Sequence, residues 1–229
     1  MKRVGFLQIV FVLGLTVFVS CGGGTSKPGS AKVKSNAYLG KLPGTVDIYL
    51  EEEQRINDEA EAEAKKKYGG LRLNADQFAE MQKKYGPREE ANNIMLLQAI
   101  EAAGKELVGK NIPFESRHTF LEAVSIIISD VDDDHPSIGT YVLVKAKEPF
   151  PLEYTYAVEL FLEYLDSEGK VLHRSKCSAN SNDKKMSSTR KAEIGEEFKA
   201  HMNLILADMP SMTDLEKIVI ITKEEFGTK

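Results

Sequence analysis

The apolar residues of this chain change their spacing at about residue 112, and this change constrains the fold more than any other feature of the sequence. Before it, apolar residues recur at steps of three and four, as in Leu96, Ile100 and Leu107, which is the spacing of one helix face. After it, they alternate with polar residues, as in the stretch 154–164, which is the spacing of a half-buried strand. The sequence therefore predicts an α+β chain in which helices come first and strands follow.

Three helices are expected in a helical region over residues 45–110. The first covers residues 51–67, where helix formers dominate and neither Gly nor Pro occurs, and Gly69 ends it. The second begins after Asn74, which forms a variant of the capping box with Gln77. Pro87 suits the first turn of a third helix. We therefore expect the second and third helices to be separate.

Six or so strands with turn signals between them are expected in residues 111–229, and this pattern predicts an antiparallel sandwich. The sequence Asp166-Ser167-Glu168-Gly169 predicts a hairpin loop with the glycine in a left-handed conformation. The order of strands resembles immunoglobulin-like modules of exported bacterial lipoproteins over roughly residues 112–226. The resemblance implies an immunoglobulin-like β-sandwich and carries no functional residue to this chain.

The N-terminus has the three parts of a secretory signal. Lys2 and Arg3 are basic, residues 4–19 are almost wholly apolar, and Ser20 is small. The apolar run is shorter than the roughly 20 residues of a membrane-spanning helix. Residues 1–20 are therefore expected to be a signal peptide.

The residues at the end of this signal add a lipid anchor to the prediction. The sequence Phe18-Val19-Ser20-Cys21 resembles the lipobox of bacterial lipoproteins. The resemblance implies that the Cys21 thiol receives a diacylglycerol, that the peptide is cut before Cys21, and that the new amine is acylated, for example with palmitate. Residues 21–44 would then be a lipidated flexible tether. Gly22 follows the cysteine, and the resemblance therefore favours attachment to the outer membrane of the bacterial envelope. The periplasmic face and the cell surface are both open as locations.

Composition narrows the class of protein. The chain has 229 residues, of which 42% are hydrophobic and 28% charged, and its net charge is −5. These values fit a globular protein and exclude collagen or disorder for the whole chain. The negative balance argues against nucleic acid as a partner. Two cysteines are too few for a disulfide framework.

One acidic segment deserves comparison with calcium loops. Asp130, Asp132 and Asp134 have the alternate spacing by which such loops present oxygens. However, His135 stands where the loop needs glycine, and Tyr141 stands where it needs a glutamate. We expect a solvated turn that binds no metal; a site with further ligands from other loops is the alternative.

The remaining chemically active side chains have no spacing that defines a site. Glu115 and His118 have a Glu-x-x-His spacing, which can face a metal on a helix, but here a strand is expected to follow. His173 is expected to be packed in the sheet and His201 to point outward. Cys177 is expected to be a buried, inert thiol.

Two segments are open to interpretation as binding surfaces. Residues 51–67 have a thin apolar face, which predicts a solvated helix; a partner-binding or self-associating helix is the alternative. Residues 178–192 are polar with several basic residues, which predicts a long loop; contact with an acidic partner or a glycan is the alternative.

No spacing typical of an enzyme occurs: there is no nucleophile elbow, metalloprotease helix, phosphate loop or dinucleotide fingerprint. We predict no catalytic residue and no cofactor. The sequence favours a membrane-anchored lipoprotein that acts as a non-enzymatic binding module for a protein or glycan partner. A structural or assembly subunit of an envelope complex is the alternative, and a hydrolase with an unrecognised site is the weakest hypothesis.

Overall fold

The computed structural model describes residues 33–132, 137–152, 156–181 and 190–227. Residues 33–229 form one compact unit, separate from residues 1–32. The signal peptide, the lipobox and Cys21 lie outside the described residues, so their prediction stays a prediction.

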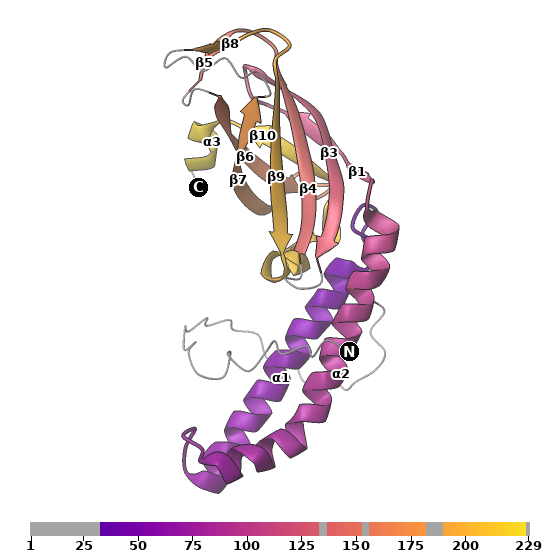
Figure 1. The fold of residues 1–229 in the computed structure, drawn as a ribbon, viewed down its shortest axis with the longest axis vertical. Coiled ribbons are helices and arrows are strands. Elements are labelled where there is room, and N and C mark those ends of the chain that lie inside the picture. Colours follow the sequence, from indigo (N-terminus) through magenta and orange to yellow (C-terminus); the bar gives the residue numbers. More distant parts are fainter. Residues whose placement is uncertain (1–32, 133–136, 153–155, 182–189, 228–229) are drawn as a thin grey trace. The chain divides into compact units, whose positions relative to one another are not determined.

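Two long helices come first and the strands follow, so the α+β class is confirmed (Figure 1). The elements in chain order are α1 (Leu42–Tyr68), α2 (Ala75–Leu107), β1 (Asn111–Ile112), β2 (Phe114–Ser116), β3 (Leu121–Asp132), β4 (Ser137–Ala146), β5 (Phe150–Pro151), β6 (Ala157–Leu165), β7 (Val171–Ser181), β8 (Lys191–Ala192), β9 (Glu197–Ile205), the 3₁₀ helix η1 (Leu206–Asp214), β10 (Lys217–Ile221) and α3 (Lys223–Gly227).

The loop between α1 and α2 has the predicted caps. Gly69 has φ 76°, the left-handed conformation that ends a helix. The Asn74 side chain accepts a hydrogen bond from the backbone N–H of Gln77 at 3.0 Å, and the Gln77 side chain accepts one from the backbone N–H of Asn74, also at 3.0 Å. This reciprocal pair satisfies two amides at the start of α2.

The prediction of separate helices on either side of Pro87 is wrong, because α2 runs through it without a break. Proline lacks an N–H and crowds the carbonyl four residues back, which normally ends a helix. Contacts with α1 hold the helix on both sides of Pro87. The Tyr85 hydroxyl donates to Glu63 at 2.7 Å, and Arg88 donates to Glu59 at 2.5 Å. Packing against α1 therefore outweighs the tendency of Pro87 to end the helix.

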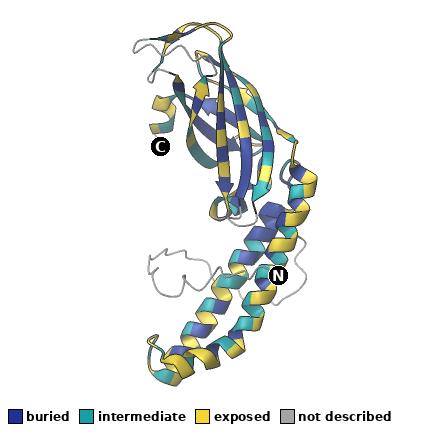
Figure 2. Cartoon of the chain, viewed as in Figure 1, coloured by how far each residue is buried: buried dark blue, intermediate teal, exposed yellow. Residues whose placement is uncertain are grey.

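Buried residues occur along both helices of the hairpin (Figure 2), and the apolar ones form two clusters. Its half nearer the sheet joins the main core through residues of both helices, including Val46, Leu96 and Ile100. Its other half has a cluster of its own, formed by Ile56, Ala60, Ala64, Met81 and Tyr85. The half that lies away from the sheet is therefore held by its own packing and by ion pairs between the helices.

The eight main strands form one sheet in the order β1-β3-β4-β9-β7-β6-β10-β2. All pairs are antiparallel except β10 with β2. The two end strands, β1 and β2, are consecutive in the chain and only Pro113 separates them. The sheet therefore curls until its two edges are joined through one residue. Two separate facing sheets were expected, so the immunoglobulin-like sandwich is not confirmed.

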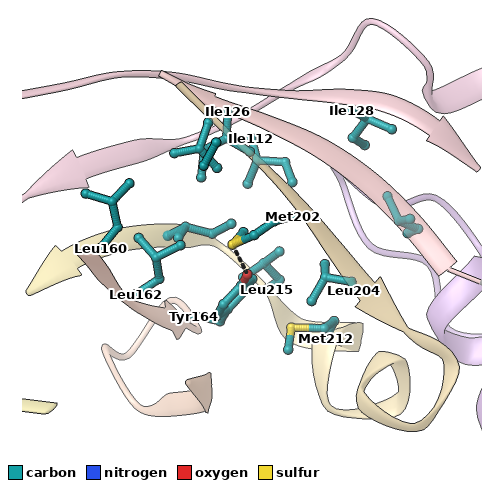
Figure 3. Packing of buried hydrophobic residues seen from close by; sticks show 14 of the residues in the cluster. Ile112, Ile126, Ile128, Leu160, Leu162, Tyr164, Met202, Leu204, Met212 and Leu215 are labelled. Atoms are coloured by element: carbon teal, nitrogen blue, oxygen red, sulfur yellow. Dashed lines mark hydrogen bonds between the residues drawn. The ribbon is translucent and has the colours of Figure 1, made fainter. Parts of the chain in front are cut away.

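The main core fills the inside of this curled sheet (Figure 3). The side chains that meet there come from β3, β6 and β9 in alternation, as the period of two requires, and η1 adds methionines. Members include Ile126, Ile128, Leu160, Leu162, Tyr164, Met202, Leu204 and Met212. Burial raises the pKa of the Tyr164 phenol above its ordinary value, and its hydroxyl lies 3.2 Å from Ser175 Oγ.

The strands β6 and β10 are buried on both faces. Their outer face carries Phe161, Leu165, Val219 and Ile221, and Phe226 of α3 packs against this cluster. The apolar run of β10 is continuous, as expected for a strand buried on both faces, and β10 lies between β6 and β2.

The chain enters the fold where α1 begins. The buried Asn36 side chain donates to the backbone carbonyl of Leu215 at 2.8 Å, and its oxygen accepts from the backbone N–H of Leu39 at 3.0 Å. Leu39 and Leu42 are buried. Packing of the described chain therefore begins upstream of residue 45, the predicted start of the helical region.

Candidate functional site

A bulge in β3 brings two polar side chains to one histidine. The register of β3 and β4 shifts between Ile128 and Asp130, so Ser129 and Asp130 together face a single residue of β4. The Ser129 hydroxyl donates to Asp130 Oδ2 at 2.7 Å and lies 3.2 Å from His201 Nε2. Asp130 Oδ2 lies 3.5 Å from the same nitrogen. Bulges commonly occur beside functional sites because they redirect side chains.

The residue opposite the bulge is Gly139, and its missing side chain makes room for the carboxylate. A Cβ built on Gly139 would lie under 3.0 Å from Asp130, a distance that real Cβ atoms essentially never show. Glycine inside a strand often marks such a close approach. The position of Asp130 therefore depends on Gly139.

Tyr141 completes the cluster on the adjacent strands. It pairs with His201 across β4 and β9, and the two ring centroids lie 5.1 Å apart at an interplanar angle of 56°. The side chain of Tyr141 is 58% exposed. An exposed aromatic ring beside a hydroxyl, a carboxylate and an imidazole offers both an apolar face and hydrogen-bonding groups.

Apolar side chains lie on the same outer face of β3, β4 and β9, which we call the β3–β4–β9 face, together with polar residues such as Lys199 and Asn203. Val124 is 44% exposed and Ile205 is 53% exposed. Ile127 and Leu143 alternate with buried neighbours and are half-buried. Phe226 of α3 packs on the outer face of β6 and β10, whereas Val124, Tyr141 and Ile205 on the β3–β4–β9 face are exposed. An uncovered apolar surface of this kind is typical of an interaction site.

The arrangement of Ser129, Asp130 and His201 does not match a catalytic triad. In a triad the hydroxyl and the carboxylate bind the two different ring nitrogens of the histidine. Here Ser129 and Asp130 both approach Nε2. The three side chains therefore form a hydrogen-bonded cluster that differs from the triad arrangement.

The acidic segment predicted as a turn is described only in part, because residues 133–136 lie outside the described residues. Asp130 and Asp132 belong to β3. Within the described ranges, no group of three or more His, Cys, Asp or Glu side chains is placed to hold a metal ion.

The Glu-x-x-His pair is divided between two environments. Glu115 lies in β2 and pairs with Lys217 at 2.7 Å. His118 Nδ1 accepts the backbone N–H of Phe120 at 3.2 Å. Burial lowers the pKa of His118, and the charge of Lys147 lowers it further. The two side chains are not brought together.

The structure confirms the expectations for His173 and His201, and it places Cys177 half-buried against the main core. His173 lies on the inner face of β7 with Cys177, and its ring packs edge-on against Tyr164 with centroids 5.1 Å apart. His201 is exposed on the outer face. Burial raises the pKa of the Cys177 thiol to about 12, so the reactive thiolate is disfavoured.

The predicted loop 178–192 is shorter than expected. Residues 178–181 extend β7, residues 191–192 form β8, and residues 182–189 lie outside the described residues. Arg190 donates to Glu196 at 3.0 Å, and both side chains are buried. This arginine is therefore neutralised within the fold.

Sequence reasoning missed Tyr141, Gly139 and the link from His201 to β3. The sequence contains a signal for Tyr141 and for Gly139. Tyr141 stands out of phase with its buried neighbour Val142, and a glycine two residues earlier interrupts a strand-forming run. The link to His201 depends on strand register, which no local spacing reveals.

Comparison with protein-family models, with curated proteins and with solved structures finds no match to this chain. Among the described helices, none combines the length and the apolar character needed to cross a membrane.

Proposed function

We propose that this chain is a bacterial envelope lipoprotein, anchored through Cys21, that acts as a non-enzymatic binding module for a protein or glycan partner. The outer membrane is the proposed location. The resemblance of the strand region to immunoglobulin-like modules is part of this proposal. It rests on the number and spacing of the strands, whereas the single curled sheet and the parallel pair of β10 with β2 differ from a sandwich.

The observation that carries the proposal is the β3–β4–β9 face with Tyr141 at its centre. Tyrosine is enriched at the centres of protein interfaces, where an aromatic anchor is surrounded by apolar and polar contacts. The aliphatic side chains of Val124, Ile127 and Leu143 offer no hydrogen bond to a sugar hydroxyl, and burial of an unpaired hydroxyl is costly. The face therefore favours a protein over a glycan.

A photo-crosslinking amino acid at position 141, introduced into the chain in intact cells, tests this face. We expect a discrete adduct after irradiation. The matched control places the same amino acid at Glu168, which is exposed in the turn between β6 and β7 and should give no such adduct. Failure at both positions, or equal labelling at both, contradicts the proposed face. An adduct that co-purifies only with cell-wall glycan identifies the glycan alternative.

The anchor is tested separately with metabolically supplied palmitate. We expect the full chain to be labelled and the Cys21→Ser variant to remain unlabelled and uncut. Equal labelling of both contradicts the lipoprotein assignment.

A structural or assembly subunit is the second candidate, and the hairpin of α1 and α2 favours it. The half of the hairpin away from the sheet has its own apolar cluster. Ion pairs join its two helices, including Arg88 with Glu59 at 2.5 Å. A rigid projecting element of this kind suits attachment to another component. The hydrolase hypothesis gains nothing from the geometry at His201.

A further inference from the structure

The end of the helical hairpin is basic although the chain is acidic. Residues 65–84, which we call the hairpin end, include the last turn of α1, the connecting loop and the first turns of α2. They hold six basic and two acidic residues, so their net charge is +4, whereas the whole chain carries −5. This concentration of positive charge is therefore local to one end of the hairpin.

Half of these basic side chains are not neutralised within the fold. Lys65, Lys67 and Lys84 form ion pairs with glutamates of the two helices. The other three make no ion pair within the described part of the chain: Lys66, Arg72 and Lys83. These three side chains are exposed, so their charge is available to an anionic surface.

Two large apolar side chains are exposed at the same place. Leu71 in the connecting loop is 47% exposed, and Phe78 in the first turns of α2 is 42% exposed. Surfaces that lie on lipid bilayers combine Lys and Arg with Leu, Phe or Trp, because the apolar groups enter the interface while the cations meet anionic headgroups. The hairpin end has both components.

The length of chain before the fold allows contact with a bilayer. The backbone of Lys34 crosses α1 at Gly44, where a Cβ would lie 2.5 Å from the Lys34 carbonyl oxygen. From this crossing to Gly69 is about 37 Å along the helix at 1.5 Å per residue. The chain from Cys21 to Val33 spans at most about 43 Å when extended. A lipid on Cys21 and the hairpin end are therefore able to reach the same membrane.

We propose that the hairpin end docks on the anionic phospholipid surface of the bilayer to which the chain is anchored. The reach argument rests on the proposed lipid anchor, whereas the charge and the exposed apolar side chains do not. A membrane suits these features better than an acidic protein does, because the anchor keeps a bilayer permanently within reach and supplies both anionic headgroups and an apolar layer. The hairpin would then hold the sheet at a defined orientation to the membrane.

Vesicle co-sedimentation of residues 33–229, which form a compact unit of their own, tests this proposal without the acyl chains. We expect binding to vesicles of phosphatidylcholine with 30% phosphatidylglycerol, weakening as salt rises, and little binding to phosphatidylcholine alone. Each basic residue near an anionic surface strengthens binding about fivefold. The Lys66→Gln/Arg72→Gln variant should therefore bind about 25-fold more weakly, and Leu71→Ser should also weaken binding.

The matched control is Lys170→Gln/Lys176→Gln, which removes the same charge from exposed positions near β7 and should bind as the parent does. Three results would overturn the proposal: no binding to the anionic vesicles at low salt, equal binding to both kinds of vesicle, or an equal loss in the control. Because the protein in this assay carries no lipid, a failure here leaves the Cys21 anchor to be judged by palmitate labelling alone.

Discussion

Replacement of Gly44 by alanine tests how the chain enters its fold. Gly44 lies in the first turn of α1, and the backbone of Lys34 passes directly over it. A Cβ at this position would lie 2.5 Å from the Lys34 carbonyl oxygen and 3.0 Å from its nitrogen, whereas ordinary contact begins at 3.4 Å. The crossing segment would have to move by about 0.9 Å, the difference between 3.4 and 2.5 Å.

Two effects of opposite sign determine how Gly44→Ala changes the free energy of unfolding. Alanine stabilises a helix by at most about 1 kcal/mol relative to glycine. Overpacking a close contact costs about 1–3 kcal/mol. Because the clash involves backbone rather than a flexible side chain, we expect the second effect to dominate and Gly44→Ala to lower the free energy of unfolding by about 1–2 kcal/mol.

Gly104→Ala is the matched control, since Gly104 is also inside a helix but a Cβ there would lie 4.0 Å from Val131, an ordinary contact. Thermal unfolding followed by circular dichroism should show Tm falling by about 2–8 °C for Gly44→Ala and rising by about 2–4 °C for Gly104→Ala. If Gly44→Ala raised Tm as much as the control does, the crossing of Lys34 over α1 would be refuted.

Three further outcomes are expected. Burial, and then the charge of Glu89, raise the pKa of Glu53. Ionisation of Glu53 therefore destabilises the fold above pH 4.5 and not below it. In denaturant titrations, Glu53→Gln should raise the free energy of unfolding by about 0.5 kcal/mol at pH 7 and leave it unchanged at pH 3. With a pKa near 12, Cys177 in residues 33–229 should react with iodoacetamide at pH 8 far more slowly than in urea, and equal rates by mass spectrometry would contradict its burial. Gly139→Ala should displace the Asp130 carboxylate, because an alanine Cβ would meet its oxygens. It should change the free energy of unfolding by less than about 1 kcal/mol, because the end of this exposed side chain can move. An unchanged His201 imidazole signal in NMR spectra would show that the carboxylate had not moved.

Local signals in the sequence predicted the local features of the fold. Gly69 ends α1, Asn74 caps α2, and Gly169 has φ 81° in the hairpin turn, as expected. Each of these depends on a few neighbouring residues, whose conformational preferences are properties of the residues themselves. β9 likewise alternates between buried and exposed residues. The stretch 154–164 was expected to be half-buried, but β6 is buried on both faces because Phe226 of α3 packs on its outer face.

Features that depend on distant residues were not predicted. The continuity of α2 through Pro87 rests on contacts with α1, more than 20 residues away. The pairing of β2 with β10 joins segments that carry no complementary local pattern. In the candidate site, Ser129 and His201 are 72 residues apart, and their meeting depends on a bulge and on strand register. Spacing along one segment contains no information about either.

The joining of the sheet edges through Pro113 has a consequence for how the protein folds. Phe114 of β2 and its partner Ile218 in β10 are 104 residues apart in the chain. Contacts between segments so far apart in sequence form slowly, because the intervening loop must close first. Until then the edge of β6 and the short β2 remain open to pairing with other chains. The sheet is therefore vulnerable to pairing with other chains until β10 is in place, and removal of β10 would leave these edges open permanently.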